Sequence, residues 1–195
     1  YGIVKNFIRE VRPKNDAPAV YRYETKPGVQ AQVDWAECGK IEIDGKIRKL
    51  YCFTMILGIS RMRFAEFTLQ TDVFTLIQCH KNAFDYFGGY PQEILYDNMK
   101  QIVLDRKEVS SESKWNTKFE DFFKHYGFIP RLCRPYRPQT KGKIESTVKF
   151  VKRYFFMGGN FTSFSDINQQ LQQWLLRVNT SIQGTTHEIP AEKLK

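Results

Sequence analysis

The chain has 195 residues, of which 42% are hydrophobic and 15% aromatic, so it can form one packed core with short flanking pieces. Its apolar runs stay well short of the roughly 20 residues needed to cross a bilayer, which argues against a membrane protein. The 30 basic and 21 acidic residues give a net charge of +9. Four scattered cysteines without a Cys-x-x-Cys pair and three histidines without ligand-like spacing favour neither a disulfide framework nor a zinc site, and they fit a reducing, cytoplasmic setting.

The basic excess is concentrated in one window. Residues 131–153 hold eight basic residues and one acid, Glu145, for a net charge of +7. A basic stripe of this kind is typical of a surface that binds phosphate backbones, because each neutralised phosphate releases counterions. An ordinary solvated helix face would have the same composition, so both interpretations stay open on charge alone.

The first part of the chain predicts a short basic helix over residues 1–12, ended by Pro13, and then a linker up to residue 27. The main domain is expected to begin near Gly28. Its first strands are predicted from alternating apolar residues and from an Asp44-Gly45 hairpin turn. The segments concerned are residues 29–36, 41–43, 49–59 and 62–69.

The second half alternates helices with strands. A helix capped by Thr71 or Asp72 ends at the glycine pair 88–89, and a helix over residues 115–126 ends at Gly127. Further helices are predicted over residues 142–156 and after Ser165, and strands over residues 93–97 and 128–133. This order predicts an α/β fold with a mixed five-stranded sheet, in which three antiparallel strands precede parallel strands reached through helical crossovers.

Two aspartates occupy positions where a carboxylate is unexpected or well placed for ligand binding. Asp34 lies inside a strand-forming segment, where burial is costly unless the carboxylate is paired or bound to a metal. Strand alternation could equally place it on a solvent face. Asp97 ends an apolar strand, where open α/β sheets often present ligand-binding groups, although an Asp-Asn pair is also common in turns.

Glu145 is the single acid of the basic stripe. Lys149 and Lys152 follow it at spacings of four and seven residues, so all three side chains share one helical face. A surface ion pair between Glu145 and Lys149 is the simpler interpretation. A carboxylate beside two ammonium groups also suits a metal-bound phosphate.

Three motifs contain these acids in order: QVDWAE at residues 32–37, YDNMK at 96–100 and RPYRPQTKGKIES at 134–146. Together they resemble the catalytic core of DDE transposases of the retroviral-integrase type. The segments PGVQAQVDW and YDNMKQIV are most similar to IstA-type insertion-sequence transposases, and the resemblance covers residues 27–157. Many relatives continue the second motif as Asp-Asn-Gly, whereas Met99 and Lys100 follow Asn98 here.

This resemblance implies an RNase H-like fold in which Asp34, Asp97 and Glu145 are catalytic and hold two Mg²⁺ ions, with Mn²⁺ able to substitute. Carboxylate oxygens are hard ligands that suit these ions better than zinc. The implied reaction is 3′-end cleavage of an insertion sequence and strand transfer, both by in-line phosphodiester displacement. DNA contacts are implied for a further set: Lys149, Lys152, Arg137, Lys143, Tyr136 and Gln139.

The resemblance also implies partners and domains. The partners would be DNA from transposon ends and target, an AAA+ ATPase helper and further copies of the chain. No membrane is expected as a partner. The protein would lie in a bacterial cytoplasm, associated with the nucleoid. The implied domains are the tail of a DNA-binding helix-turn-helix region, a linker, the catalytic core and a second linker towards a small C-terminal β-domain. Their expected bounds are residues 1–12, 13–27, 28–182 and 183–195.

Two other functions fit the same sequence. An RNase H-like nuclease or resolvase that cleaves without joining would use the same acids, with a fourth carboxylate such as Asp105 or Glu108. A non-catalytic DNA-binding assembly domain would keep only the fold.

Trp35 and Trp115 are expected to fill the core, whereas Trp174, on an amphipathic helix, could face the core or a second protomer.

Overall fold

The computed structural model describes residues 7, 25–43, 45–97, 99–105, 113–133, 142–184 and 186–194, with side chains in the helix that starts at residue 142 described from Thr147 onward. The central feature is a five-stranded sheet in the order β3-β2-β1-β4-β7. Its strands are β1 (Gln30–Ile43), β2 (Lys46–Leu57), β3 (Arg63–Thr68), β4 (Glu93–Tyr96) and β7 (Ile129–Leu132). β1, β2 and β3 pair antiparallel, and β4 and β7 add in parallel, so the predicted mixed sheet is confirmed.

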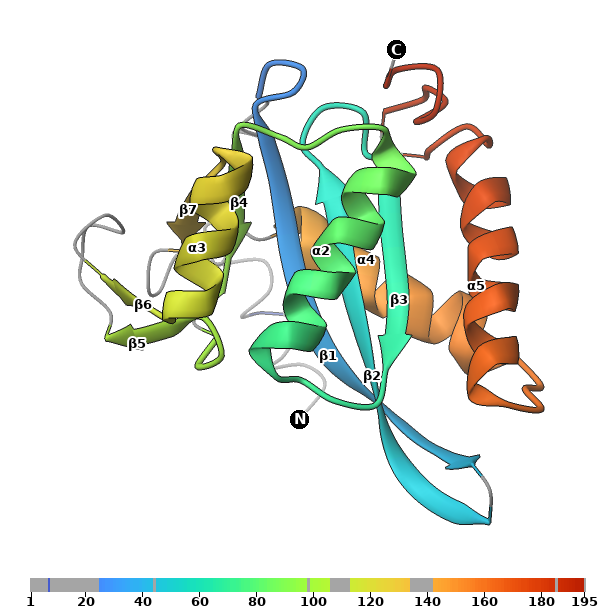
Figure 1. Cartoon of the computed structure of the whole chain (residues 1–195). Helices are drawn as coiled ribbons and strands as arrows, with labels where there is room; N and C mark the ends of the chain where they lie inside the picture. The colour runs from blue at the N-terminus through green and yellow to red at the C-terminus, as the bar shows by residue number, and fades with distance from the viewer. Residues whose placement is uncertain are drawn as a thin grey trace.

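β1 and β2 form one long hairpin. The predicted strand segments 29–36 and 41–43 are parts of a single strand, which is interrupted by a register shift between Glu37 and Gly39. Gly39 has a φ of +141°, which a side chain rarely adopts, so the glycine permits this bulge. The hairpin projects beyond the rest of the sheet (Figure 1).

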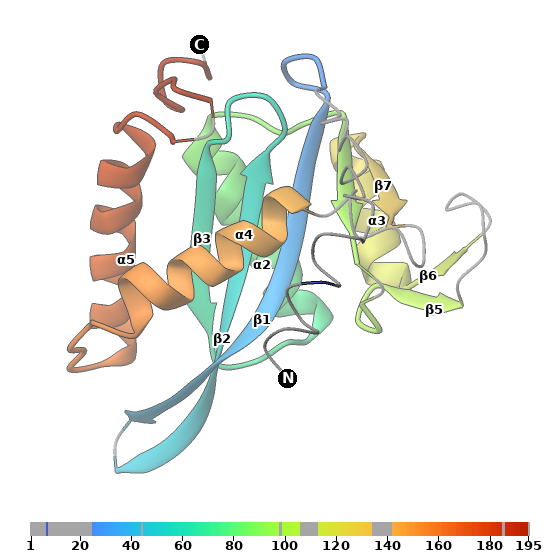
Figure 2. The ribbon, with the colours of Figure 1, turned by 180° about the vertical axis from the view of Figure 1, so that it is seen from behind.

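Helices cover both faces of the sheet. α2 (Val73–Phe87) and α3 (Thr117–Tyr126) bury one face together with Ala31, Val33 and Tyr96. α4 (Gly142–Val151) and α5 (Phe164–Asn179) lie on the other face, which is seen in Figure 2. The sheet therefore separates two apolar clusters, as expected for a three-layer α/β domain. None of the described helices is both long and apolar enough to cross a membrane.

Local signals explain where the helices begin and end. The Asp72 side chain accepts hydrogen bonds from the amides of Phe74 and Thr75, and Gly88 closes α2 in the left-handed conformation. The Asn116 side chain likewise accepts from the amide of Lys118 at the start of α3, and Gly127 ends that helix in the left-handed conformation. The predicted helix bounds are therefore nearly those observed.

Two features depart from the prediction. β5 (Val103–Asp105) and β6 (Lys114–Trp115) form a separate two-stranded sheet, so Trp115 precedes α3 instead of starting it. The predicted helix over residues 142–156 is α-helical up to Val151 and continues as a π-helix, η3 (Lys152–Phe156).

The expectation that Trp35 and Trp115 fill the core is confirmed, since Trp115 is buried and Trp35 packs against the same core. Trp174 packs against Phe155 at 5.5 Å between ring centroids, so part of its ring faces the core.

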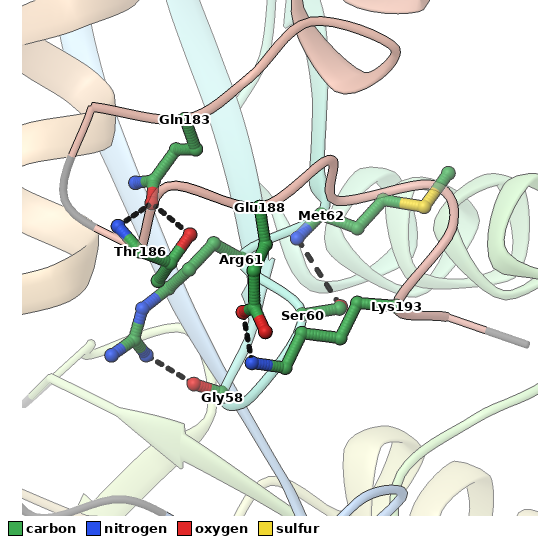
Figure 3. A network of polar contacts seen from close by, with 8 residues as sticks. All are labelled: Gly58, Ser60, Arg61, Met62, Gln183, Thr186, Glu188 and Lys193. Atoms are coloured by element: carbon green, nitrogen blue, oxygen red, sulfur yellow. Dashed lines mark hydrogen bonds and ion pairs between the residues drawn. The ribbon is translucent and has the colours of Figure 1, made fainter.

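The C-terminal segment folds back beside the turn between β2 and β3 (Figure 3). In that turn Arg61 has a φ of +61° and its guanidinium donates to the carbonyl oxygen of Gly58. Glu188 pairs with Lys193, and Leu194 packs against the core of the α2 face. The packing of Leu194 and a hydrogen bond from the Ala191 amide to the Asn179 carbonyl oxygen attach residues 186–194 to the domain. Their assignment to a linker stays a prediction, as do the other domain bounds.

Candidate active site at the β1–β4 edge

Asp34 and Asp97 come from neighbouring parallel strands. The pairing of β1 with β4 runs from Gln30 opposite Glu93 to Val33 opposite Tyr96. Asp34 and Asp97 are the next residues of each strand, so they occupy the next position of the same register. Adjacent strands lie about 4.8 Å apart, so the backbones of these two residues are expected to be neighbours at the carboxyl end of β4.

The environment of Asp34 fixes its position without removing it from solvent. Its backbone carbonyl oxygen accepts a hydrogen bond of 3.3 Å from the Thr54 hydroxyl of β2, and its side chain is half-buried. Val33 and Trp35, its neighbours in sequence, contribute to the core on the α2 face. Strand alternation therefore directs Asp34 to the opposite face, which α4 covers.

α4 crosses this face of the sheet over β1 and β2, as Figure 2 shows. Val148 and Val151 are buried beneath it, and η3 continues it with the buried Phe155. On the flank towards β1, the Lys152 ammonium group donates to the backbone carbonyl oxygen of Glu37. The helix that contains Glu145 is therefore attached to the strand that contains Asp34.

The predicted site residues are described in full, by their backbone alone, or not at all. Asp34 and Asp97 are brought together, and Lys149 lies exposed on α4 while Lys152 is half-buried. The backbone of Glu145 and Lys143 lies in the first turn of α4, and their side chains lie outside the described part. Tyr136, Arg137 and Gln139 lie outside the described residues altogether.

A buried pair of side chains beneath Asp97 was not predicted. His80, on α2, is fully buried, with Nδ1 2.7 Å from the carbonyl oxygen of Leu76 and Nε2 2.8 Å from the Tyr96 hydroxyl. Because a carbonyl only accepts, Nδ1 carries the proton and Nε2 accepts from the Tyr96 hydroxyl. Burial lowers the pKa of His80 to about 4, so the ring is neutral near pH 7. The pair holds the residue that directly precedes Asp97.

The chemistry of this edge suits a hard divalent cation. Asp34 and Asp97 directly follow the paired residues Val33 and Tyr96 and carry carboxylate oxygens, the ligands that Mg²⁺ and Mn²⁺ prefer. Among the side chains that the structure describes, no three His, Cys, Asp or Glu form a complete metal cluster. Of the two acids that would favour a nuclease, Asp105 lies on β5 of the separate two-stranded sheet, and Glu108 lies outside the described residues.

Comparison with known proteins identifies relatives of the whole chain. The profile of the integrase core domain family matches residues 24–138, a range that includes Asp34 and Asp97. The chain is 42% identical over 192 residues to a putative transposase for insertion sequence element IS5376 of Geobacillus stearothermophilus, covering 98% of this chain and 48% of that protein. It is 37% identical over 179 residues to the transposase for insertion sequence element IS21 of Pseudomonas aeruginosa, covering 91% and 45%.

Solved structures agree with the fold. The HTLV-2 integrase catalytic core domain in complex with magnesium aligns with a TM-score of 0.62 at 14% identity, over 87% of this chain and 98% of that chain. A chain of the simian T-cell lymphotropic virus intasome aligns with a TM-score of 0.66 at 14% identity, over 89% and 57%. These alignments confirm the predicted RNase H-like fold. The chain spans about half the length of the curated relatives described above.

Proposed function

Because the chain belongs to the integrase core domain family, we propose that it is the catalytic part of a bacterial DNA transposase of the insertion-sequence type. The reaction would be cleavage at the 3′ ends of the element followed by joining of those ends to target DNA. The similarity to the IS5376 and IS21 transposases supports this substrate class.

The observation that carries the proposal is the parallel register of β1 and β4. The paired segment ends with Val33 opposite Tyr96, directly before Asp34 and Asp97, the acids of the first two motifs. The third acid, Glu145, belongs to α4, which packs on the same face of β1. Long-range strand pairing and helix packing support a shared site for three acids that are separated by 62 and 47 intervening residues in the sequence.

We propose that Asp34, Asp97 and Glu145 hold two divalent ions, Mg²⁺ or Mn²⁺. Such ions, when bound, activate an attacking oxygen and stabilise the leaving oxygen of a phosphodiester. Two contacts would help to position these carboxylates: the hydrogen bond from the Thr54 hydroxyl to the Asp34 carbonyl oxygen, and the His80–Tyr96 pair at the residue before Asp97. The resemblance to a magnesium-bound viral core supports this choice of ion.

DNA would lie along the outer side of α4. Lys149 is exposed there, and the net charge of +7 over residues 131–153 favours phosphate contacts. Lys152 is attached to Glu37, so we propose that it orients α4 on β1 as well as contributing positive charge. We propose further DNA contacts by four residues: Arg137, Lys143, Tyr136 and Gln139. We also propose an AAA+ helper and further copies of the chain as partners.

The test is strand cleavage and joining on labelled terminal-repeat DNA, with the full-length protein that contains this chain, its helper and Mg²⁺ or Mn²⁺. Asp97→Asn and Glu145→Gln should abolish both cleaved and joined products. Asp121→Asn is the matched control, because Asp121 is exposed on α3, a helix of the other face. It should leave both products unchanged.

The outcomes separate this function from its alternatives. Metal-dependent cleavage without any joined product would favour the nuclease, and DNA binding without chemistry would favour an assembly domain. Full activity in either active-site variant would refute the assignment of the acids.

A further inference from the structure

A second site lies on the far flank of α4. A pocket of about 420 Å³ opens between α4, α5 and the start of β3, and Figure 2 shows these elements from the side on which the helices lie. Its lining includes Arg63 from β3, Phe150 from α4, Trp174 and Arg177 from α5, and residues 181–184. Pockets of this size commonly accept ligands.

Arg63 is a buried cation with one donor atom, Nε, that lacks a hydrogen-bond partner in the described part of the protein. The residue is 8% exposed, and the Nε atom itself is buried. Its guanidinium carbon lies 5.0 Å from the centroid of the Phe150 ring, so one face of the group is stacked. The backbone is clamped, since its amide donates to Asn179 Oδ1 at 3.0 Å and its carbonyl accepts from Asn179 Nδ2 at 2.7 Å. The donor is therefore held in place.

The polar groups of the pocket favour an anion. Burial, and secondarily the charge of Arg61, lower the pKa of Arg63, as expected for a cation that lacks a counter-charge. Arg177 adds a second guanidinium at the exposed rim. The side-chain oxygen of Gln183 is occupied by the amide and hydroxyl of Thr186, so its NH₂ group remains as a donor. The described lining contains no carboxylate.

The apolar part of the lining favours a protein ligand over DNA. The Phe150 and Trp174 rings pack 5.2 Å apart and form one wall. Ile182 in the lining is 69% exposed. Aromatic and arginine side chains beside exposed aliphatic groups are typical of peptide-binding surfaces. The opposite flank of α4, with Lys152, faces β1 and the proposed DNA site.

We propose that this pocket binds a peptide segment of a partner protein that presents an aspartate or glutamate beside an apolar side chain. The carboxylate would accept from Arg63 and Arg177, and its apolar neighbour would cover Trp174 and Ile182. The site is separate from the proposed catalytic edge, so it would recruit a partner without blocking DNA.

The test begins with selection of a displayed library of random short peptides on the immobilised chain. Enriched peptides should carry an acidic residue next to an aromatic or aliphatic one. Their affinity should fall about tenfold or more in Arg63→Gln and in Arg177→Gln, the loss expected for one charge-assisted hydrogen bond. In ¹H–¹⁵N spectra of the unmodified chain, the peptides should shift the side-chain N–H signals of Arg63.

Arg131→Gln is the matched control. It removes the same charge from an exposed arginine that pairs with Glu93 on the β4–β7 side of the sheet, so peptide affinity should not change. Arg177 is exposed, and its variant remains informative even if Arg63→Gln disturbs folding. Failure of any acidic peptide to enrich, indifference of the peptides to both arginines, or a shift of the Arg63 signal by single-stranded DNA in place of peptide would overturn the proposal.

Discussion

Acid should destabilise this domain through His80. The neutral ring is enclosed by Phe53, Phe84 and Phe128, donates to Leu76 and accepts from Tyr96. A proton on Nε2 would leave two donors facing one another and would place a charge in an apolar core. In the unfolded chain the His80 ring is in water, so it takes up a proton at higher pH than in the folded protein.

The size of the effect follows from the two pKa values. The pKa is about 4 in the folded protein and near 6.5 in an unfolded chain, and one pKa unit corresponds to 1.36 kcal/mol. Because the folded value is the lower one, the stability is fully present above pH 6.5. It should fall by about 2 kcal/mol at pH 5 and by about 3 kcal/mol near pH 4, where the loss levels off.

The assay is urea unfolding of the chain at several pH values between 7 and 4.5. His80→Gln should be less stable at pH 7 and should lose most of the pH dependence over this range. His125→Gln is the matched control, since His125 is exposed at the end of α3, and it should keep the dependence. An unchanged acid slope in His80→Gln would refute the reasoning.

Three further expectations follow from single contacts. Tyr96→Phe leaves His80 Nε2 buried without a donor and should cost about 1–3 kcal/mol in urea unfolding. Cys38, whose pKa is lowered chiefly by a hydrogen bond from a neighbouring thiol, should react with iodoacetamide before the three buried cysteines, as followed by mass spectrometry. Gly58→Ala places a Cβ 2.9 Å from a backbone carbonyl oxygen and should destabilise by about 1–3 kcal/mol, whereas Gly89→Ala, with open space around its Cβ position, should change stability little in thermal unfolding.

The sequence was sufficient for most of the fold because its local signals agree with the tertiary structure. Asp72 and Gly88 mark the ends of α2, and alternating residues mark the long hairpin. The β5–β6 pair was missed because strands of three and two residues are too short to show a periodicity. Strand pairing at that length depends on contacts that only the folded chain supplies.

The sequence was enough to single out the acids of the site, but not the buried side chains that pack around it. Asp34 was ambiguous by alternation, and its proximity to Asp97 depends on a pairing between residues 63 positions apart. The motif resemblance was the signal that joined them. Neither His80 nor Arg63 has a sequence signature, since a histidine in an apolar helix and an arginine at a strand start are distinguished only by their burial and partners.

The most direct test of the central claim is strand joining by an Asp97→Cys variant of the full-length protein, compared in Mg²⁺ and in Mn²⁺. A thiolate is a poor ligand for Mg²⁺ and a better one for a softer transition-metal ion. If Asp97 binds the ion directly, joining should be lost with Mg²⁺ and partly restored with Mn²⁺. Joining at the unmodified level with Mg²⁺, or an equal loss with both ions, would contradict direct ligation by Asp97.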